Sequence, residues 1–211
     1  RRVLFRSINN YSEYVTLNGG AGADTIKNYG SNVTIDGGKG NDYIISEVDN
    51  VNIFGGDNND TVINDGGEVS IWGGSGNNVI STDGNSVSVV GGTGKDTILS
   101  GNESVSSIGA YSTIYSGAGA DSIKNFADNV IIYGEGNSDT IENYGAYIKA
   151  YGGAGADTIY NEGVNAYISL GDGNDFVDNH ATANIIAGNG ADTIINYGDE
   201  SNLNGGAGAD I

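Results

Sequence analysis

One aspartate recurs every 18 residues along most of this 211-residue chain, each time after a glycine-rich turn. The stretch Gly19-Gly20-Ala21-Gly22-Ala23-Asp24 returns as Gly37-Gly38-Lys39-Gly40-Asn41-Asp42. Glycine takes the positive backbone angles that a tight turn needs. Such a turn directs backbone carbonyl groups toward one point. Carboxylate and carbonyl oxygens are the ligands of hard cations such as Ca²⁺, which takes about six to eight of them, so stacked turns would form a row of shared cation sites.

The aspartates keep their register along the chain, although the interval is 25 residues from Asp96 to Asp121 and 17 from Asp175 to Asp192. We predict that several Ca²⁺ ions are ligated by the carboxylates of Asp24, Asp42, Asp60, Asp96, Asp121, Asp139, Asp157, Asp175, Asp192 and Asp210. The carbonyl ligands would come from around Gly20, Gly22, Gly38, Gly40, Gly92, Gly94, Gly117, Gly119, Gly153, Gly155, Gly171, Gly173, Gly188, Gly190, Gly206 and Gly208. We expect weaker or empty sites near Asn78, which replaces an aspartate, near Asn58, which replaces a turn glycine, and at the irregular turn 134–139.

The segments between these turns have the pattern of short β-strands. Each unit divides into two nine-residue halves, and both halves end in alternating apolar and polar residues, the period of a strand. One inward position holds Ile26, Ile44, Val62, Ile80, Ile98, Ile123, Ile141, Ile159, Val177 and Ile194. A single unit cannot bury its apolar face alone, whereas stacked units bury a continuous core. We therefore predict an all-β fold, a parallel β-roll or β-solenoid with about 18 residues and two short strands per coil.

The turn resembles the Gly-Gly-x-Gly-x-Asp-x-U-x nonapeptide, with U apolar, of RTX or hemolysin-type calcium-binding repeat proteins. Full six-residue matches lie at 19–24, 37–42, 91–96, 152–157 and 205–210, and the resemblance extends over residues 8–211. It implies a parallel β-roll with Ca²⁺ between the turns, in a bacterial protein that is secreted or displayed at the cell surface. It also implies a repeat that is often unfolded at low intracellular calcium and folds outside the cell.

The alternate nonapeptide departs from that family. Val33 and its equivalents stand where the second aspartate would be, and a methyl-bearing side chain cannot ligate Ca²⁺, so we expect calcium along one edge only. That half begins with a recurring asparagine, which we expect to stack as an amide ladder: Asn28, Asn64, Asn125, Asn143, Asn161, Asn179 and Asn196. Residues 105–116 contain seven surplus residues, either a bulged loop or an extra half-turn that would move the calcium column to the other edge.

Composition limits the possible partners. The net charge of −19, from 27 acidic and 8 basic residues, leaves no basic patch for nucleic acid. The chain has no cysteine, and no apolar run approaches the length of a membrane span. No nucleophile–base pair can be recognised, so we expect no catalytic residue and no enzyme activity in this chain; a catalytic domain would lie outside it. Protein or carbohydrate partners are left open.

The two ends differ from the repeats. Residues 1–7, Arg-Arg-Val-Leu-Phe-Arg-Ser, match the translation of a sequencing adaptor and are interpreted as an artefact. We therefore expect one β-solenoid domain over residues 8–211, with an irregular coil near 103–116. The chain stops within a repeat at Ile211, so we expect truncation at both ends and a longer repeat array in the parent protein.

The sequence thus predicts a calcium-binding repeat module of a secreted or surface bacterial protein, with folding coupled to Ca²⁺ along one edge. Two alternatives remain open: a structural spacer of an adhesin or surface-layer protein, and an accessory repeat of a secreted hydrolase or toxin. Tyr29, Tyr144 and Tyr197 share a turn position and are interpreted as scattered turn aromatics rather than a carbohydrate-stacking stripe. Neither Trp72 nor His180 has a sequence partner that suggests chemistry.

Overall fold

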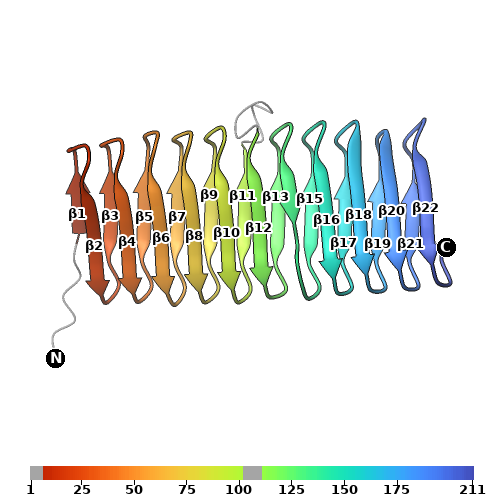
Figure 1. The fold of residues 1–211 in the computed structure, drawn as a ribbon, viewed down its shortest axis with the longest axis horizontal. Helices are drawn as coiled ribbons and strands as arrows, with labels where there is room; N and C mark the ends of the chain where they lie inside the picture. Colours follow the sequence, from red (N-terminus) through yellow and green to blue (C-terminus); the bar gives the residue numbers. More distant parts are fainter. Residues whose placement is uncertain (1–6, 102–110) are drawn as a thin grey trace.

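In the part of the chain that the structure describes, the roll consists of two parallel β-sheets of 11 strands each, joined strand by strand into a stack of coils (Figure 1). This computed structural model describes residues 7–101 and 111–211. Odd-numbered strands form one sheet and even-numbered strands the other, and each strand pairs with the equivalent strand of the next coil. The predicted all-β solenoid with two strands per coil is confirmed. No helix long and apolar enough to span a membrane occurs in the described ranges.

The strands of the odd sheet are short and evenly spaced: β1 (Ser7–Asn10), β3 (Thr25–Asn28), β5 (Tyr43–Ser46), β7 (Thr61–Asn64), β9 (Val79–Thr82), β11 (Thr97–Ser100), β13 (Ser122–Asn125), β15 (Thr140–Asn143), β17 (Thr158–Asn161), β19 (Phe176–Asn179) and β21 (Thr193–Asn196). Those of the even sheet are β2 (Thr16–Ala21), β4 (Thr34–Lys39), β6 (Asn52–Asp57), β8 (Ser70–Ser75), β10 (Ser88–Thr93), β12 (Thr113–Ala118), β14 (Ile131–Tyr133), β16 (Lys149–Ala154), β18 (Ala166–Asp172), β20 (Ala183–Asn189) and β22 (Asn202–Ala207).

A thin apolar core lies between the two sheets. In the odd sheet Ile26 pairs with Ile44, and in the even sheet Ile35 pairs with Ile53, so equal side chains stack coil on coil. All four are fully buried. Burial of each isoleucine contributes about 1.5–3 kcal/mol, which a single coil cannot obtain alone because its neighbours supply the cover. Of the ten inward valine and isoleucine residues predicted from the sequence, nine are fully buried, and Ile194, near the end of the roll, is half-buried.

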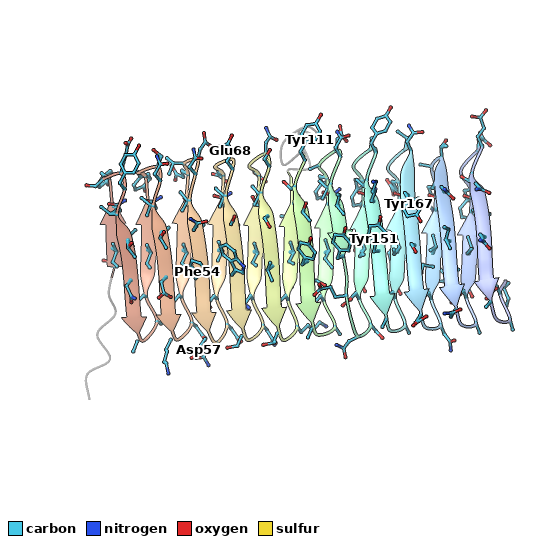
Figure 2. The ribbon with its side chains drawn as sticks, in the orientation of Figure 1. Phe54, Asp57, Glu68, Tyr111, Tyr151 and Tyr167 are labelled. Carbon is cyan, nitrogen blue, oxygen red and sulfur yellow. The ribbon has the colours of Figure 1, made fainter. Side chains whose placement is uncertain are left out.

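The turns at the two edges of the roll differ in composition. We call the turns that lead from an even strand to the next odd strand the glycine edge, and the turns from an odd strand to the next even strand the asparagine edge. Asp57 lies at the glycine edge, whereas Glu68 and Tyr111 lie at the asparagine edge (Figure 2). The cation-ligand candidates are thus gathered on one side of the molecule, and the recurring asparagines on the other.

The longer interval between Asp96 and Asp121 leaves the coil order unchanged. Strand β12 pairs with β10, and the backbone N–H of Asp96 donates to Oδ1 of Asp121 at 2.7 Å. The aspartate column therefore stays on the same edge and does not cross the roll. The predicted irregular coil near 103–116 falls largely on residues 102–110, which lie outside the described residues, as do residues 1–6 of the predicted adaptor segment. Ser7 begins strand β1.

Candidate metal centre

The aspartates of the glycine edge point into the roll. Alternation along each odd strand places the aspartate, the core isoleucine and the asparagine on one inner face, as in Asp24, Ile26 and Asn28. From Asp24 to Asp192, nine predicted carboxylates are at most 3% exposed. Asp210, in the last coil, is exposed. Nine of the ten predicted carboxylates are therefore buried, which is unusual for charged side chains unless they are paired or bind a metal.

From Asp42 onward, one oxygen of each buried carboxylate holds neighbouring coils together, whereas neither oxygen of Asp24 has a hydrogen-bond partner. The backbone N–H of Asp139 donates to Oδ1 of Asp157 at 2.8 Å, and that of Asp157 donates to Oδ1 of Asp175 at 2.8 Å. The same bond joins the other neighbouring coils from Asp24 to Asp192, at 2.7 to 3.0 Å. Part of the column is therefore structural, because Oδ1 satisfies a buried amide that the turn leaves without a backbone partner.

The second oxygen of each carboxylate has no hydrogen-bond partner. Within the described residues this holds for the buried Oδ2 atoms of Asp24, Asp42, Asp60, Asp96, Asp121, Asp139, Asp157, Asp175 and Asp192. A buried polar atom without a partner costs about 1–3 kcal/mol, and more when it carries charge. A column of such atoms one coil apart also concentrates negative charge. Protons or cations bound by the column would reduce this cost.

The pKa values of the carboxyls reflect this environment. Burial raises the pKa of Asp60 and Asp139 to about 7, against the hydrogen bond from the preceding aspartate N–H, and the neighbouring carboxylates raise it further. Burial likewise raises the pKa of Asp96 and Asp175 to about 6. Near neutral pH the carboxyls of Asp60 and Asp139 are therefore divided between the protonated and the charged form, and a bound divalent cation would favour the charged form.

The first glycine of each turn leaves room beside the unpartnered oxygen. A β-carbon at Gly152 would lie 2.5 Å from Oδ2 of Asp157 and 2.6 Å from the carbonyl oxygen of Leu170 in the next coil. The same two kinds of oxygen approach Gly19, where the distances are 3.0 Å to Asp24 Oδ2 and 2.5 Å to the Gly37 carbonyl oxygen. We call this space the cradle. The first glycine thus keeps this space open and is not needed for its backbone angle, because its φ is not in the left-handed region.

The second and fourth turn glycines are required for a different reason. Gly153 has φ of 112° and Gly155 has φ of 142°, angles that other residues rarely adopt. The carbonyl oxygens of the equivalent residues in the preceding coil, Glu135 and Asn137, approach their α-carbons where a β-carbon would be. The predicted link between glycine, tight turning and nearby carbonyl oxygens is therefore present in the geometry.

Turns that depart from the repeat keep the same path, but non-glycine residues then adopt positive φ angles. Asn58 takes the fourth glycine position at φ of 84°, and Glu135 and Asn137 take the second and fourth positions at 71° and 75°. Asp139 nevertheless stays in the column. At Asn78 the amide nitrogen occupies the place of Oδ2 and donates to the Gly76 carbonyl at 3.3 Å. That coil offers a donor where its neighbours offer an acceptor.

Three coils have a side chain in the cradle, a difference that the spacing of the aspartates alone does not predict. Ser116, Leu170 and Ala187 occupy the first turn position before Asp121, Asp175 and Asp192, and all three are buried. The Ser116 hydroxyl donates to the Gly134 carbonyl oxygen at 2.8 Å, so this carbonyl oxygen already has a hydrogen-bond partner. These cradles are smaller than those beside a first glycine.

The donor set of the open cradles fits Ca²⁺. It combines buried carboxylate oxygens without partners, nearby backbone carbonyls, and a space that only glycine leaves free, all of which are oxygen-ligand features of calcium rather than of soft metals. In the described residues, no group of three or more His, Cys, Asp or Glu side chains converges on one point. Calcium would therefore be held by carboxylates from the column together with backbone carbonyls.

The asparagine edge forms the predicted amide ladder from Asn125 to Asn196, whereas Asn28 and Asn64 bond to hydroxyl groups in the next coil. Nδ2 of Asn125 donates to Oδ1 of Asn143 at 2.8 Å, and the series continues through Asn161 and Asn179 to Asn196 at 2.6 to 2.7 Å. Ser46, Thr82 and Ser100 take the asparagine position in three coils. The hydroxyls of Ser46 and Thr82 accept the bond, whereas Asn64 Oδ1 and the Ser100 hydroxyl have no hydrogen-bond partner, so the ladder is interrupted in these coils. Val33, which replaces the second aspartate of the family motif, is buried, as are its valine equivalents. This edge is therefore closed by neutral groups.

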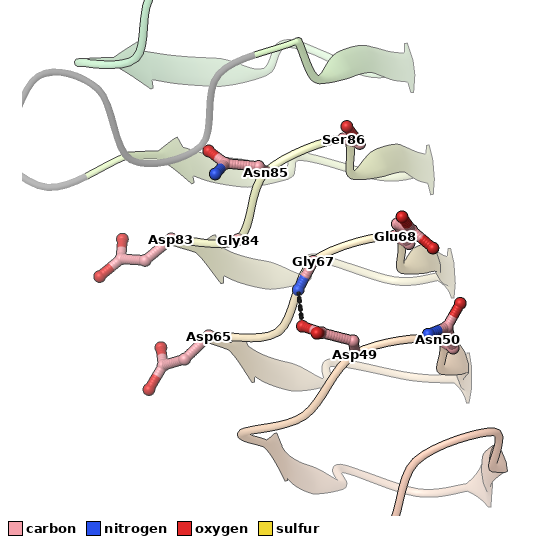
Figure 3. A pocket seen from close by; sticks show the side chains of 9 residues that line it. All are labelled: Asp49, Asn50, Asp65, Gly67, Glu68, Asp83, Gly84, Asn85 and Ser86. Atoms are coloured by element: carbon pink, nitrogen blue, oxygen red, sulfur yellow. Dashed lines mark hydrogen bonds between the residues drawn. The ribbon is translucent and has the colours of Figure 1, made fainter.

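A shallow acidic hollow lies on the outer surface of the asparagine edge, over coils three to five (Figure 3). It is lined by Asp49, Asn50, Asp65, Gly67, Glu68, Asp83, Gly84, Asn85 and Ser86. Asp49 accepts a hydrogen bond from the Gly67 N–H at 2.7 Å. Burial raises the pKa of Asp65, and Asp83 and Glu47 raise it further. These side chains lie on the outside of the roll, in contrast to the buried aspartate column.

The aromatic residues are more ordered than the sequence interpretation assumed. The ring of Tyr29 stacks on that of Tyr11, with centroids 5.1 Å apart. Acidic residues occupy the same turn position in the coils that follow Tyr29. Trp72 stacks on Phe54 with ring centroids 4.6 Å apart, and His180 lies 3.0 Å from Asp178. The Phe54–Trp72 pair begins a longer row on the even sheet, which could have been found from its 18-residue spacing.

Comparison with known protein families supports the same interpretation. The family model described as the RTX calcium-binding nonapeptide repeat matches the chain in four copies, at residues 18–53, 36–71, 72–104 and 149–165. No curated protein and no solved structure matches the chain.

Proposed function

Because the chain carries RTX calcium-binding nonapeptide repeats, we propose that it is a module whose folding is completed by Ca²⁺ along the glycine edge. The observation that supports this best is the row of buried, unpartnered Oδ2 atoms. Unfolded, these carboxylates are hydrated and far apart. Folded without metal, they are desolvated and repel one another, so a cation that binds only the folded roll stabilises it.

The residues that would hold Ca²⁺ are those of the open cradles. Asp42, Asp60, Asp96, Asp139 and Asp157 each follow a first-position glycine and have neighbours on both sides. Bound calcium would supply positive charge to Oδ2 and to the carbonyl oxygens of adjacent coils. Calcium occupancy would be lower beside Ser116, Leu170 and Ala187, where a side chain fills the cradle, and beside Asn78, where an amide donor replaces the ligand.

The remaining parts of the proposal follow from this role. Extracellular calcium modules commonly have dissociation constants of about 10⁻⁴–10⁻³ M, so such sites fill outside the cell rather than in the cytosol. A secreted or surface-displayed bacterial parent protein agrees with that range. The roll itself is a repeat scaffold, and the aspartates recur as part of it. We propose a binding and structural role for this chain and no catalytic one.

A constitutive structural rod is the second candidate. It is favoured by the asparagine ladder from Asn125 to Asn196 and by the Oδ1 bonds between neighbouring coils, which form without metal. In this case the glycine edge would be stabilised by protonation of the column, and calcium would add little. Spacer segments of adhesins or surface layers would have this behaviour.

Far-UV circular dichroism of the chain during a Ca²⁺ titration separates the two candidates, with Mg²⁺ as the control ion. A cooperative gain of β signal with Ca²⁺ and not with Mg²⁺ supports the calcium-dependent module. A spectrum that is already fully β in chelator and does not respond to Ca²⁺ contradicts it and favours the rod. Isothermal titration calorimetry under the same conditions counts the ions bound per chain.

A further inference from the structure

An aromatic row runs along the outer face of the even sheet. It consists of Phe54, Trp72, Val90, Tyr115, Tyr133 and Tyr151, one residue from each of six successive coils. Phe54 and Tyr151 are seen on the same face in Figure 2, with Tyr167 beside the far end. Trp72 lies 4.6 Å from Phe54 with an interplanar angle of 6°, and the three tyrosines are stacked at 4.8 and 4.9 Å. The row thus consists of a stacked pair and a stacked group of three tyrosines, with Val90 between them.

The row itself, from Phe54 to Tyr151, is an uncharged strip although the protein is acidic, and the equivalent residue of the preceding coil is Asp36. The other outward position of the same strands holds Asn52, Ser70, Ser88, Thr113, Ile131 and Lys149, of which only Lys149 is charged. Elsewhere the net charge of −19 repels other copies of the chain. An uncharged aromatic strip on such a surface marks a place where contact is not opposed by charge.

The orientation of the rings argues against a sugar-stacking surface. A pyranose packs against the open face of an aromatic ring. In this row the faces cover one another at 6° to 8°, and the rings present their edges and hydroxyl groups outward. Stacked aromatic ladders on parallel strands in register instead pack against the ladder of a second sheet, with interdigitated side chains and about 10 Å between the sheets.

We propose that the even sheet is the interface of a face-to-face homodimer, with the aromatic row at its centre. The even sheet, 11 strands of about six residues, outlines roughly 1,000 Å² at about 4.8 Å between strands and 3.3 Å per residue. A standard interface buries about 800 Å² per partner, so the sheet is large enough. The occupant is a second copy because a two-fold interface needs the same patch on both partners.

A two-fold axis between β10 and β12 would place Val90, the one small residue of the row, opposite a large one. It places Val90 of one copy opposite Tyr115 of the other, and Phe54 opposite Tyr151. The small valine receives the larger tyrosine, as in an interdigitated core. The two rolls would lie antiparallel, and their acidic edges would remain in solvent, where salt screens them.

The test is the mass of the full 211-residue chain in calcium buffer, measured by sedimentation velocity across a dilution series. The emission of Trp72, the only tryptophan, reports on the strip in the same samples. A dimer with a dissociation constant of about 10 µM would be mostly associated at about 100 µM. We expect doubled mass together with a blue shift of Trp72 emission, because the indole loses water when the row is covered.

Two variants and a matched control locate the interface. Tyr115→Glu and Val90→Glu each place a charge in the row, and we expect both to weaken dimerisation at least about 100-fold, since like charges and a buried carboxylate would face the partner. Leu99→Glu introduces the same charge on the outer face of the odd sheet and should leave the dimer unchanged. Far-UV circular dichroism verifies that each variant keeps its β signal.

A wild-type chain that remains monomeric at about 100 µM in calcium and 0.15 M salt would overturn the proposal. So would a dimer whose Trp72 emission does not change, or one that all three variants weaken equally. The outcome is separable from the calcium proposal. If the roll were already folded in chelator and unresponsive to calcium, the strip would still be formed, and dimerisation would then be seen in chelator once salt screens the charge.

Discussion

The substitution Asp157→Asn should change stability in opposite directions with and without calcium. Asp157 is 1% exposed, its Oδ1 accepts the Asp139 N–H at 2.8 Å, and its Oδ2 has no partner. Asparagine keeps the accepting oxygen and replaces Oδ2 with an amide group. Asn78 shows where that group goes, because its Nδ2 donates to the carbonyl of Gly76 two residues earlier.

The magnitudes follow from these contacts. In chelator the substitution removes a buried oxygen without a partner, a group that costs about 1–3 kcal/mol, so the variant should be more stable by about that amount. In calcium the wild type gains RT ln(1 + [Ca²⁺]/Kd) per site, about 2.7 kcal/mol when calcium exceeds Kd by about 100-fold. The variant loses a ligand of that site and should be less stable than the wild type by about 1–3 kcal/mol.

The assay is urea unfolding followed by far-UV circular dichroism, once in chelator and once in millimolar calcium. Glu162→Gln removes the same charge from an exposed side chain and corrects for the change in net charge. The two unfolding curves of Asp157→Asn should lie on opposite sides of the wild type. If the variant is less stable than the wild type in chelator as well, the carboxylate has only a structural role and the calcium reasoning is refuted.

Three further predictions use the same protein. In chelator the stability of the folded roll should be greatest below about pH 4 and should fall as pH rises through 6 to 7. The reason is that the pKa values of Asp60 and Asp139 are raised to about 7 in the folded roll. A series of unfolding curves in which stability is constant or rises over this pH range contradicts the prediction. Ala187→Gly should empty the cradle beside Asp192 and add about one calcium per chain by calorimetry, whereas an unchanged count means the methyl group is no obstacle. Tyr147→Asn should raise the free energy of unfolding by about 0.5–1 kcal/mol, because Tyr147 is exposed and has φ of 58°, an angle that asparagine adopts more readily. The control Val164→Asn, at an exposed residue of the next coil without a positive φ, should not raise it.

Much of the fold could be predicted because every coil repeats the same local problem. The 18-residue period, the alternation in segments such as Thr158–Asn161, and the turn glycines each depend on neighbours in the chain. The inward position of Ile159 and the presence of Asn161 in a ladder follow directly from that period, since a roll brings equivalent residues into contact. The family resemblance and the candidate aspartates also depend on local motifs alone.

The chemistry within each site was decided by the stacking of coils. Residues 18 apart become neighbours only when one coil lies on another, and their atoms then compete for the same space and the same hydrogen bonds. For this reason the sequence determined which aspartates align, whereas only the tertiary structure shows that Oδ1 of Asp157 is already bonded while Oδ2 is not. Stacking also explains why a β-carbon at Gly152 would come too close to Asp157 and to the next coil. It explains as well why Phe54 and Trp72 begin an outward-facing row.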